Sequence, residues 1–461
     1  MKIVIVGGGK VGELLSIEFS QAGHDVLLIE CSARVLEQVM EHADISGLVG
    51  NGSSYDTMME AGVGQADFFI SVTRVDEINM IAAIMAKKLG AKHTIARIRT
   101  PENYRSYSFF EESLGITMMI NPELEAAKKI AAELEFPFAL NVDSFSNNLV
   151  NVVSVPVEVD SRLVGMSLVE FKKRYQTLLV CIIVRGRETL IPRGPDVIQA
   201  GDIITVTGTK PDLEKLYHDL GAKHERVKSC IIIGASRITH YLLKMLQGTG
   251  TQIKVIEHDE EEANRLSLEF PQVSVIHADG SDKKVLDEEG IAHYGALISL
   301  TGIDEENVII SLYASTQGVD KTITKVNRTQ ILASLGEMGL QSIITPKELI
   351  ADRIIRYVRG IENSEGSSVE ALHRLADGKV ESLQFAVREG SKILGIPIRH
   401  MNIKPDITIA YIIRKGKPIF PGGDDEVKVG DRVIIVTTHP GFDDIDDILT
   451  KESAERLFFQ A

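Results

Sequence analysis

The feature that most constrains the fold of this chain is an internal repeat, because the same succession of segments is laid out twice. The glycine corner at Gly7 recurs at Gly234, 227 residues later (234 − 7), and Thr73 recurs as Thr301, 228 residues later (301 − 73). A drift of one residue over five such landmarks indicates a duplication. Both halves are therefore expected to adopt the same fold.

Each half has two parts. In the first part, apolar strand-like segments alternate with helical segments, which predicts an α/β fold with a Rossmann-like parallel sheet. The second part is shorter, with alternating strands and Gly/Pro/Asp turns, and predicts a small α+β domain. The expected Rossmann-like domains are residues 1–140 and 226–365, and the expected small domains are residues 141–225 and 366–461. The polar stretches 141–148 and 362–370 are expected to join them.

Charge and hydropathy exclude several classes of protein. The 461 residues carry a formal net charge of −15, with a pI near 5.4, so no broad basic surface is expected for nucleic acid or an anionic membrane. The sequence contains no run of 18 consecutive apolar residues that could span a membrane, and its N-terminus does not resemble a signal peptide. We therefore expect a cytoplasmic protein that reaches a membrane only through a protein partner.

The three cysteines, Cys31, Cys181 and Cys230, are isolated and lie in or beside apolar stretches. Their spacing fits neither a C-x-x-C metal site nor a redox motif. We expect them to be reduced, buried side chains, and we predict no metal site.

The first glycine corner has the spacing of a dinucleotide-binding motif. Gly7, Gly9 and Gly12 form G-x-G-x-x-G between an apolar strand and a helix. These glycines permit a tight turn, close approach of a pyrophosphate, and close packing of helix on strand. Glu30, at the end of the next strand, would accept hydrogen bonds from ribose hydroxyls and repel a 2′-phosphate. The motif therefore favours NAD or adenine nucleotides over NADP.

The second corner is a degenerate copy of the first. Gly234 is kept, but Ser236 and Thr239 replace the second and third glycines. Glu257 and Asp279 still occupy the positions that would contact a ribose. Two interpretations stay open for the second half: a nucleotide site, and a purely structural sheet.

Three polar residues follow the next strands of the first half. Thr73 and Asp76 fit the S/T-x-x-D/E pattern that caps a helix, and they also lie beside the crevice where such sheets bind ligands. Arg97 ends the following strand and is a candidate for contact with a phosphate, the alternative being a surface ion pair.

No catalytic constellation is visible in the sequence. The 12 histidines are scattered, and the chain has no G-x-x-x-x-G-K-[ST] loop, no G-x-S-x-G elbow and no H-E-x-x-H motif. A dehydrogenase would need a proton donor near the nicotinamide. We therefore expect no catalytic residues and a binding and regulatory role, with an NAD-dependent oxidoreductase as the alternative.

The first glycine corner and Glu30 occur together with "TRVDEIN", "ARIR" and the paired endings "PRGPDVIQAGDIITVTG" and "PGGDDEVKVGDRVIIV". On these motifs, nearly the whole chain resembles the TrkA family. These are the peripheral subunits of Trk-type bacterial potassium-uptake systems and consist of tandem RCK modules. The resemblance implies a cytosolic homo-oligomer, a ring of four chains, docked at the inner face of the membrane on a TrkH-type potassium-transporting subunit. NAD(H) and ATP or ADP would bias the ring between shapes that favour and shapes that disfavour conduction. The regulator of another cation channel or efflux system is the alternative.

The resemblance also implies which residues contact the ligand. In the first half they are Gly7, Gly8, Gly9, Lys10, Val11, Gly12, Glu30, Asn51, Thr73, Arg74 and Arg97. In the second half they are Gly234, Ala235, Ser236, Arg237, Ile238, Glu257, Asp279 and Thr301. Asn51 stands where the family usually has Asp, so one polar contact is expected to be weaker there. Arg97 is expected to bridge the ligand to a neighbouring domain.

Overall fold

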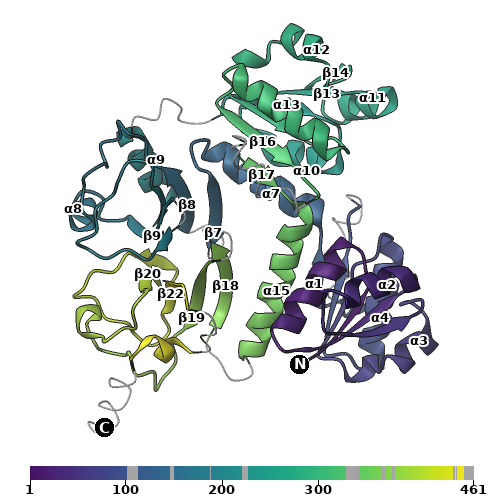
Figure 1. Ribbon diagram of the computed structural model, residues 1–461, viewed down its shortest axis with the longest axis horizontal. Coiled ribbons are helices and arrows are strands. Elements are labelled where there is room, and N and C mark those ends of the chain that lie inside the picture. Colours follow the sequence, from purple (N-terminus) through teal and green to yellow (C-terminus); the bar gives the residue numbers. More distant parts are fainter. Residues whose placement is uncertain are drawn as a thin grey trace. The chain divides into compact units, whose positions relative to one another are not determined.

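The computed structural model describes residues 1–100, 113–145, 150–186, 188–220, 227–328, 340, 342–364, 369–375, 379–439, 442 and 444–450. These residues form two six-stranded and two five-stranded sheets (Figure 1). They belong to two compact units, one made of residues 1–131 and 228–355 and the other of 132–227 and 356–461. Corresponding parts of the two halves therefore share a unit.

The first parallel sheet has the strand order β3-β2-β1-β4-β5-β6. Its strands are β1 (Lys2–Val6), β2 (Asp25–Glu30), β3 (Ser46–Val49), β4 (Phe68–Ser71), β5 (His93–Arg97) and β6 (Met118–Ile120). The helical segments between them are α1 (Lys10–Gln21), α2 (Ala33–Met40), α3 (Tyr55–Glu60), η1 (Val63–Gln65) and α4 (Asp76–Leu89). The strand order reverses between β1 and β4, and ligands of open α/β sheets bind at such a switch point.

The second parallel sheet repeats this order as β14-β13-β12-β15-β16-β17. Its strands are β12 (Ser229–Ile233), β13 (Gln252–Glu257), β14 (Ser274–His277), β15 (Ala296–Ser299), β16 (Lys321–Lys325) and β17 (Ser342–Ile344). Its helical segments are α10 (Arg237–Leu246), α11 (Glu260–Glu269), α12 (Lys283–Glu288), η2 (Ile291–His293) and α13 (Asp304–Thr316). The predicted duplication and the α/β fold class are confirmed.

A long helix follows the last strand of each parallel sheet. These helices are α7 (Pro122–Glu135) and α15 (Pro346–Ser364), and each begins with proline. Proline is favourable at this position because the N–H that it lacks would have no partner within the helix. Both helices leave the Rossmann-like unit and enter the other one.

The remaining two sheets are antiparallel and have corresponding strand orders, β10-β9-β11-β8-β7 and β21-β20-β22-β19-β18. The strands of the first are β7 (Asn141–Phe145), β8 (Val150–Pro156), β9 (Leu179–Arg185), β10 (Glu188–Leu190) and β11 (Ile203–Gly208). Those of the second are β18 (Val369–Leu375), β19 (Val380–Ala386), β20 (Ile407–Arg414), β21 (Lys417–Ile419) and β22 (Arg432–Thr437). The expected joint at 141–148 is therefore wrong in part, because β7 pairs with β8.

The helical segments of the two small domains differ. The first has helices α8 (Leu168–Arg174) and α9 (Lys210–Asp219), whereas the second has the short 3-10 helices η4 (Ile398–His400) and η5 (Ile445–Ile448). Ser167 starts α8 with a reciprocal capping box to Glu170, and Pro397 precedes η4. This capping box satisfies the first free N–H groups of α8.

Each small domain has its own apolar core, and a third apolar cluster combines the two antiparallel sheets. Its buried members from the first half are Val150, Val152, Cys181, Ile182 and Ile191, and those from the second are Leu375, Val380, Ala410, Tyr411, Ile413, Ile434 and Val436. Apolar faces buried in this way hold the two small domains together within their unit. Over the described part of the chain, no helix is both long enough and apolar enough to cross a bilayer.

Candidate nucleotide-binding site

The first glycine corner connects β1 to α1 at the switch point. Gly7 has φ +102°, and its amide donates to the carbonyl of Ile29 at 2.9 Å. A Cβ at Gly7 would lie 3.1 Å from the amide nitrogen of Thr73, and one at Gly12 would lie 1.9 Å from the Gly7 carbonyl oxygen. Neither position accepts a side chain, since the backbone turns and packs too closely there.

The N-terminus of α1 is open. Gly9 precedes the helix with no side-chain cap, and a Cβ built on Gly9 would meet nothing within 4 Å. The first N–H groups of the helix therefore have no side-chain acceptor from Gly9, and the space at Gly9 is free. Free N–H groups and the helix dipole favour a phosphate at such a position. Lys10 is exposed and Val11 is buried at the start of the same helix.

Glu30 is fixed against this corner by the backbone. One of its carboxylate oxygens accepts the amide of Gly8 at 2.6 Å, and the other accepts the amide of Ser32 at 3.0 Å. Each carboxylate oxygen has a further lone pair. The carboxylate therefore shapes the corner and can still accept a ribose hydroxyl.

Asn51 and Asp279 have the same local geometry in the two halves. The Oδ1 of Asn51 accepts the amide and hydroxyl of Ser53 at 3.0 and 2.9 Å, and the Oδ1 of Asp279 accepts those of Ser281 at 2.9 and 2.8 Å. Hydrogen bonds from the Ser281 amide and hydroxyl lower the pKa of Asp279. The turn keeps its acceptor at Asn51, although the negative charge is lost.

The turn that follows β3 contains a glycine whose role the sequence analysis missed. A Cβ on Gly52 would lie 2.1 Å from Cγ1 of Val6, and one on Gly280 would lie 2.4 Å from Cγ2 of Ile233. Both turns thus approach the end of the strand that leads into the glycine corner. The recurrence of "NGSS" as "DGSD" was the available signal.

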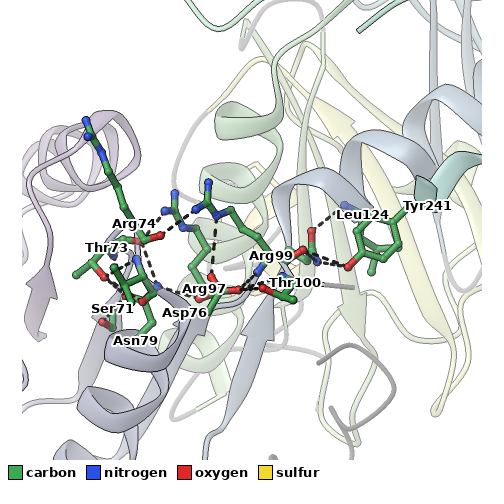
Figure 2. Close-up of polar contacts among 12 residues, drawn as sticks. Ser71, Thr73, Arg74, Asp76, Asn79, Arg97, Arg99, Thr100, Leu124 and Tyr241 are labelled. Carbon is green, nitrogen blue, oxygen red and sulfur yellow. Dashed lines mark hydrogen bonds and ion pairs between the residues drawn. The ribbon is translucent and has the colours of Figure 1, made fainter. Parts of the chain in front are cut away.

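Figure 2 shows Thr73, Asn79 and Arg97 converging where β4 and β5 end. The Oδ1 of Asn79 accepts the amide and hydroxyl of Thr73 at 2.8 and 2.7 Å, and its Nδ2 donates to the carbonyls of Thr73 and Arg97 at 3.1 and 2.9 Å. Asn79 is fully buried. Asn307 makes the corresponding bonds to the backbone of Thr301 and Lys325 in the second half. In the sequence, Asn79 is distinguished only as the last residue of the TRVDEIN motif.

The predicted helix cap at Thr73 and Asp76 is wrong. The N-cap of α4 is Val75, which has no side-chain cap. One oxygen of Asp76 instead accepts the amides of Arg99 and Thr100 at 2.9 and 3.0 Å (Figure 2). Asp76 is the first residue of the helix, so its carboxylate reaches the loop after β5 and ties it to α4.

Arg97 is half-buried and lines a pocket, and the alternative of a surface ion pair is wrong. Its guanidinium donates to the carbonyl of Thr73 at 2.5 Å, and among the described residues no carboxylate lies within ion-pairing distance of it. Burial, and then the charge of Arg99, lower the pKa of Arg97 to about 10. Arg74 is exposed, and its carbonyl accepts the guanidinium of Arg99 at 2.8 Å.

The second glycine corner reproduces the frame of the first. Gly234 has φ +101°, and its amide donates to Ile256 at 2.8 Å. The carboxylate of Glu257 accepts the amides of Ala235 and Asp259 at 2.5 and 2.9 Å. The turn and the carboxylate contacts are therefore kept in the second half, where Ser236 and Thr239 replace the second and third glycines.

The start of α10 differs from that of α1. The hydroxyl of Ser236 accepts the amide of Thr239 at 3.4 Å and caps the helix. The hydroxyl of Thr239 donates to the carbonyl of Gly234 at 2.6 Å. Next to these, Arg237 is exposed and Ile238 is buried. At the second corner, side chains of the corner itself thus bond some of the backbone N–H and C=O groups at the helix start, whereas at the first corner no such side chain is present.

Residues of both halves line a cavity of about 320 Å³ inside the Rossmann-like unit. Val11 reaches it from the first corner, and Ser236, Arg237 and Ile238 reach it from the second. Nearby, Nδ2 of Asn121 donates to the hydroxyl of Tyr241 at 2.8 Å, which joins the two halves within this unit. The described residues contain no cluster of three or more His, Cys, Asp or Glu that could hold a metal ion.

The fold and the corners define a class: tandem Rossmann-like domains, each followed by a small antiparallel domain. Residues 3–122 and 230–346 match the TrkA-N domain, and residues 152–221 and 383–450 match the TrkA-C domain. The chain belongs to the TrkA family. The resemblance drawn from its motifs is confirmed.

Named relatives cover nearly the whole chain. A Trk system potassium uptake protein TrkA homolog from Archaeoglobus fulgidus is 28% identical over 448 residues, 97% of this chain and 100% of the relative. The Trk system potassium uptake protein TrkA of Halomonas elongata is 30% identical over 441 residues, 94% of this chain and 95% of the relative. The solved structure of the GsuK channel bound to NAD has a TM-score of 0.63 at 14% identity, covering 99% of this chain and 78% of the channel chain.

Proposed function

We propose that this chain is the regulatory subunit of a potassium-transport system, binding NAD(H) and ATP or ADP and gating a TrkH-type membrane subunit. The observation that carries the proposal is the first glycine corner, where an uncapped helix N-terminus, open space at Gly9 and the fixed carboxylate of Glu30 lie together. The relatives' names support the transport role. The GsuK channel bound to NAD supports the ligand.

The remaining parts of the proposal follow from the same family. The domain limits are those expected from the sequence, at residues 1–140, 141–225, 226–365 and 366–461. The ligand contacts are those that the resemblance implies in the first half. For the corner at Ser236, a second nucleotide site and a purely structural sheet are both still open. The chain would act in the cytoplasm at the inner face of the membrane, as a ring of four copies.

A sensor role is favoured over catalysis at this corner. The polar groups that surround it are bound to backbone: Glu30 holds the amides of Gly8 and Ser32, and Asn79 holds the ends of β4 and β5. Such groups shape a binding site, whereas hydride transfer to a carbonyl substrate needs a proton donor aimed at the substrate. The geometry therefore supports binding that shifts a conformational equilibrium.

The binding step is tested by calorimetric titration of the full chain with NADH, NAD, ATP and ADP. Gly9→Ser is the informative variant, because Gly9 (φ −68°, ψ −178°) and the capping Ser236 (φ −73°, ψ 168°) have nearly the same backbone conformation. A serine at 9 would cap α1 and fill the phosphate space, so we expect affinity to fall about tenfold with little change in melting temperature. Ser236→Gly is the control and should leave the first site unchanged.

Gating is tested by potassium flux in vesicles that hold the membrane subunit together with this chain. Flux that changes with nucleotide in the wild type, and responds less in Gly9→Ser, supports regulation. Saturable binding without any effect on potassium flux would point instead to another cation channel or efflux system. Steady oxidation of NADH in the presence of cell metabolites would favour the oxidoreductase.

A further inference from the structure

The cavity inside the Rossmann-like unit is lined symmetrically by the two halves. Val11 and Ile238 are corresponding residues of the two glycine corners, and Arg97 and Lys325 are corresponding ends of β5 and β16. Glu123 and Lys347 are likewise the second residues of α7 and α15. The glycine corner of each half therefore lines the same cavity as the first turn of the other half's long helix.

This space is strongly basic although the chain is acidic. Its lining includes Arg97, Arg99, Arg237, Lys325 and Lys347 against the single carboxylate of Glu123, in a chain of net charge −15. The Nε–H group of Arg97 is buried and has no hydrogen-bond partner among the described residues, and that of Arg99 is buried with only the Oδ1 of Asp76 at 4.0 Å, too far for a hydrogen bond. Buried donors without acceptors are costly, so an anion in this cavity would be stabilised.

The corresponding positions 123 and 347 carry opposite charges. Burial raises the pKa of Glu123, and the positive charges of Arg99, Arg97 and Arg237 act against that rise. Burial and the charge of Lys10 lower the pKa of Lys347. At the second corner, the carboxylate of Glu123 is therefore near Arg237. At the first corner, the ammonium group of Lys347 is near a second cation, Lys10.

Three carboxylates, those of Glu348, Glu13 and Asp304, favour the charged form of Lys347, whereas burial, the largest effect, and the charge of Lys10 oppose it. Glu13 and Lys10 both lie in the first turn of α1, whose open N-terminus attracts anions. A phosphate at this place would separate the two lysines and pair with both.

Given the nucleotide site proposed above, we propose that Lys347 of the second half binds the phosphates of an adenine nucleotide held at the first glycine corner. At the second corner the carboxylate of Glu123 occupies the corresponding place and supplies the anion internally. Phosphate binding at the first corner then depends on both Rossmann-like domains, so it senses their separation. A ligand that bridges two domains in one state only has the differential affinity that a switch requires.

The test compares ATP, ADP and adenosine by calorimetry on the full chain and on Lys347→Glu, which copies the residue at position 123. We expect ATP affinity to fall at least tenfold, ADP affinity to fall less, and adenosine affinity to stay unchanged. Lys347→Arg should retain ATP binding because it keeps the charge. Lys88→Glu is the matched control, because Lys88 is exposed near the far end of α4 from the corner.

The outcomes separate this inference from the proposed function. Nucleotide binding that is equal in the wild type and Lys347→Glu overturns the role of Lys347 and leaves the nucleotide site standing. Equal losses for ATP and adenosine overturn it as well, since adenosine has no phosphate. Absence of nucleotide binding by the wild type overturns both proposals. Circular dichroism and melting temperature establish that each variant is folded.

Discussion

At the scale of single residues, Asn79 has a larger structural role than its place in a polar motif indicated. Its side chain accepts from the backbone of one strand end and donates to the backbone of two, and it is fully buried. Because Asn307 repeats the arrangement, the ends of β4 and β5 and of β15 and β16 are joined in the same way. The first glycine corner rests on this frame, since Gly7 packs against Thr73.

We expect Asn79→Ala to reduce the free energy of unfolding by about 2–4 kcal/mol, because buried amide and carbonyl groups would lose their partners. Urea-induced unfolding followed by circular dichroism measures the change. Asn51→Ala is the control, since Asn51 is exposed and its side chain bonds, among the described residues, only within its own turn; this change should cost less than about 1 kcal/mol. A loss at Asn79 no greater than that at Asn51 would contradict this role.

The cysteines test burial at the same scale. Cys181 and Cys230 are buried, as expected, and burial raises the pKa of each thiol to about 12. Cys31 is exposed, which corrects the prediction for that residue. It follows Glu30 at the end of β2, where the chain leaves the sheet for the surface.

We expect one thiol per native chain to react rapidly with iodoacetamide, and all three thiols to react after denaturation. Rapid reaction of a second thiol in the native chain would count against the described core.

At the scale of elements, glycines decide how closely a turn can approach a strand. The turn after β3 passes so near Val6 that a methyl group on Gly52 would overlap Cγ1 of that side chain. Gly280 stands against Ile233 in the same way. Since these turns adjoin the end of the strand that leads into each corner, the spacing of the nucleotide site depends on them.

We expect Gly52→Ala to destabilise the chain by about 1–3 kcal/mol through overpacking. Gly302→Ala is the matched control, because a Cβ there meets nothing within 4 Å and the change should be small. The double variant Gly52→Ala, Val6→Ala should recover part of the loss, since the two side chains then fit together. Additive losses in the urea midpoints would rule out the direct clash.

At the scale of the whole molecule, each domain associates with the corresponding domain of the other half. The Rossmann-like domains of both halves form one unit and the small domains form the other. In the second unit, Cys181 and Ile182 of the first half share an apolar cluster with Tyr411 and Ile434 of the second. Neither half buries this surface by itself.

We therefore expect a fragment of residues 1–227 to expose the apolar face of β8 and β9 and to self-associate. Light scattering after size-exclusion chromatography would measure its mass. Mixing it with residues 228–461 should yield a complex of one copy of each, because the cognate face is then available. A first-half fragment that stays monomeric and does not bind the second half would show that this cluster does not hold the two small domains together.

The sequence by itself determined the features that depend on neighbours along the chain. Its spacing predicted the duplication, the parallel and antiparallel domains, and a strand, turn and helix at Gly7 to Gly12 with Glu30 at the next strand end. These are set by local periodicity and by the few conformations that glycine turns allow. The sequence therefore sufficed to predict the fold class and the family.

Only the tertiary structure decided which distant residues meet. It sets Asp76 on the loop after β5 rather than at a helix cap, turns Arg97 inward, and brings Lys347 and Glu123 to one cavity from opposite halves. No local period encodes such contacts, because they arise when separate sheets bury their surfaces together. For the same physical reason, two corners with nearly equal backbones differ in charge and capping.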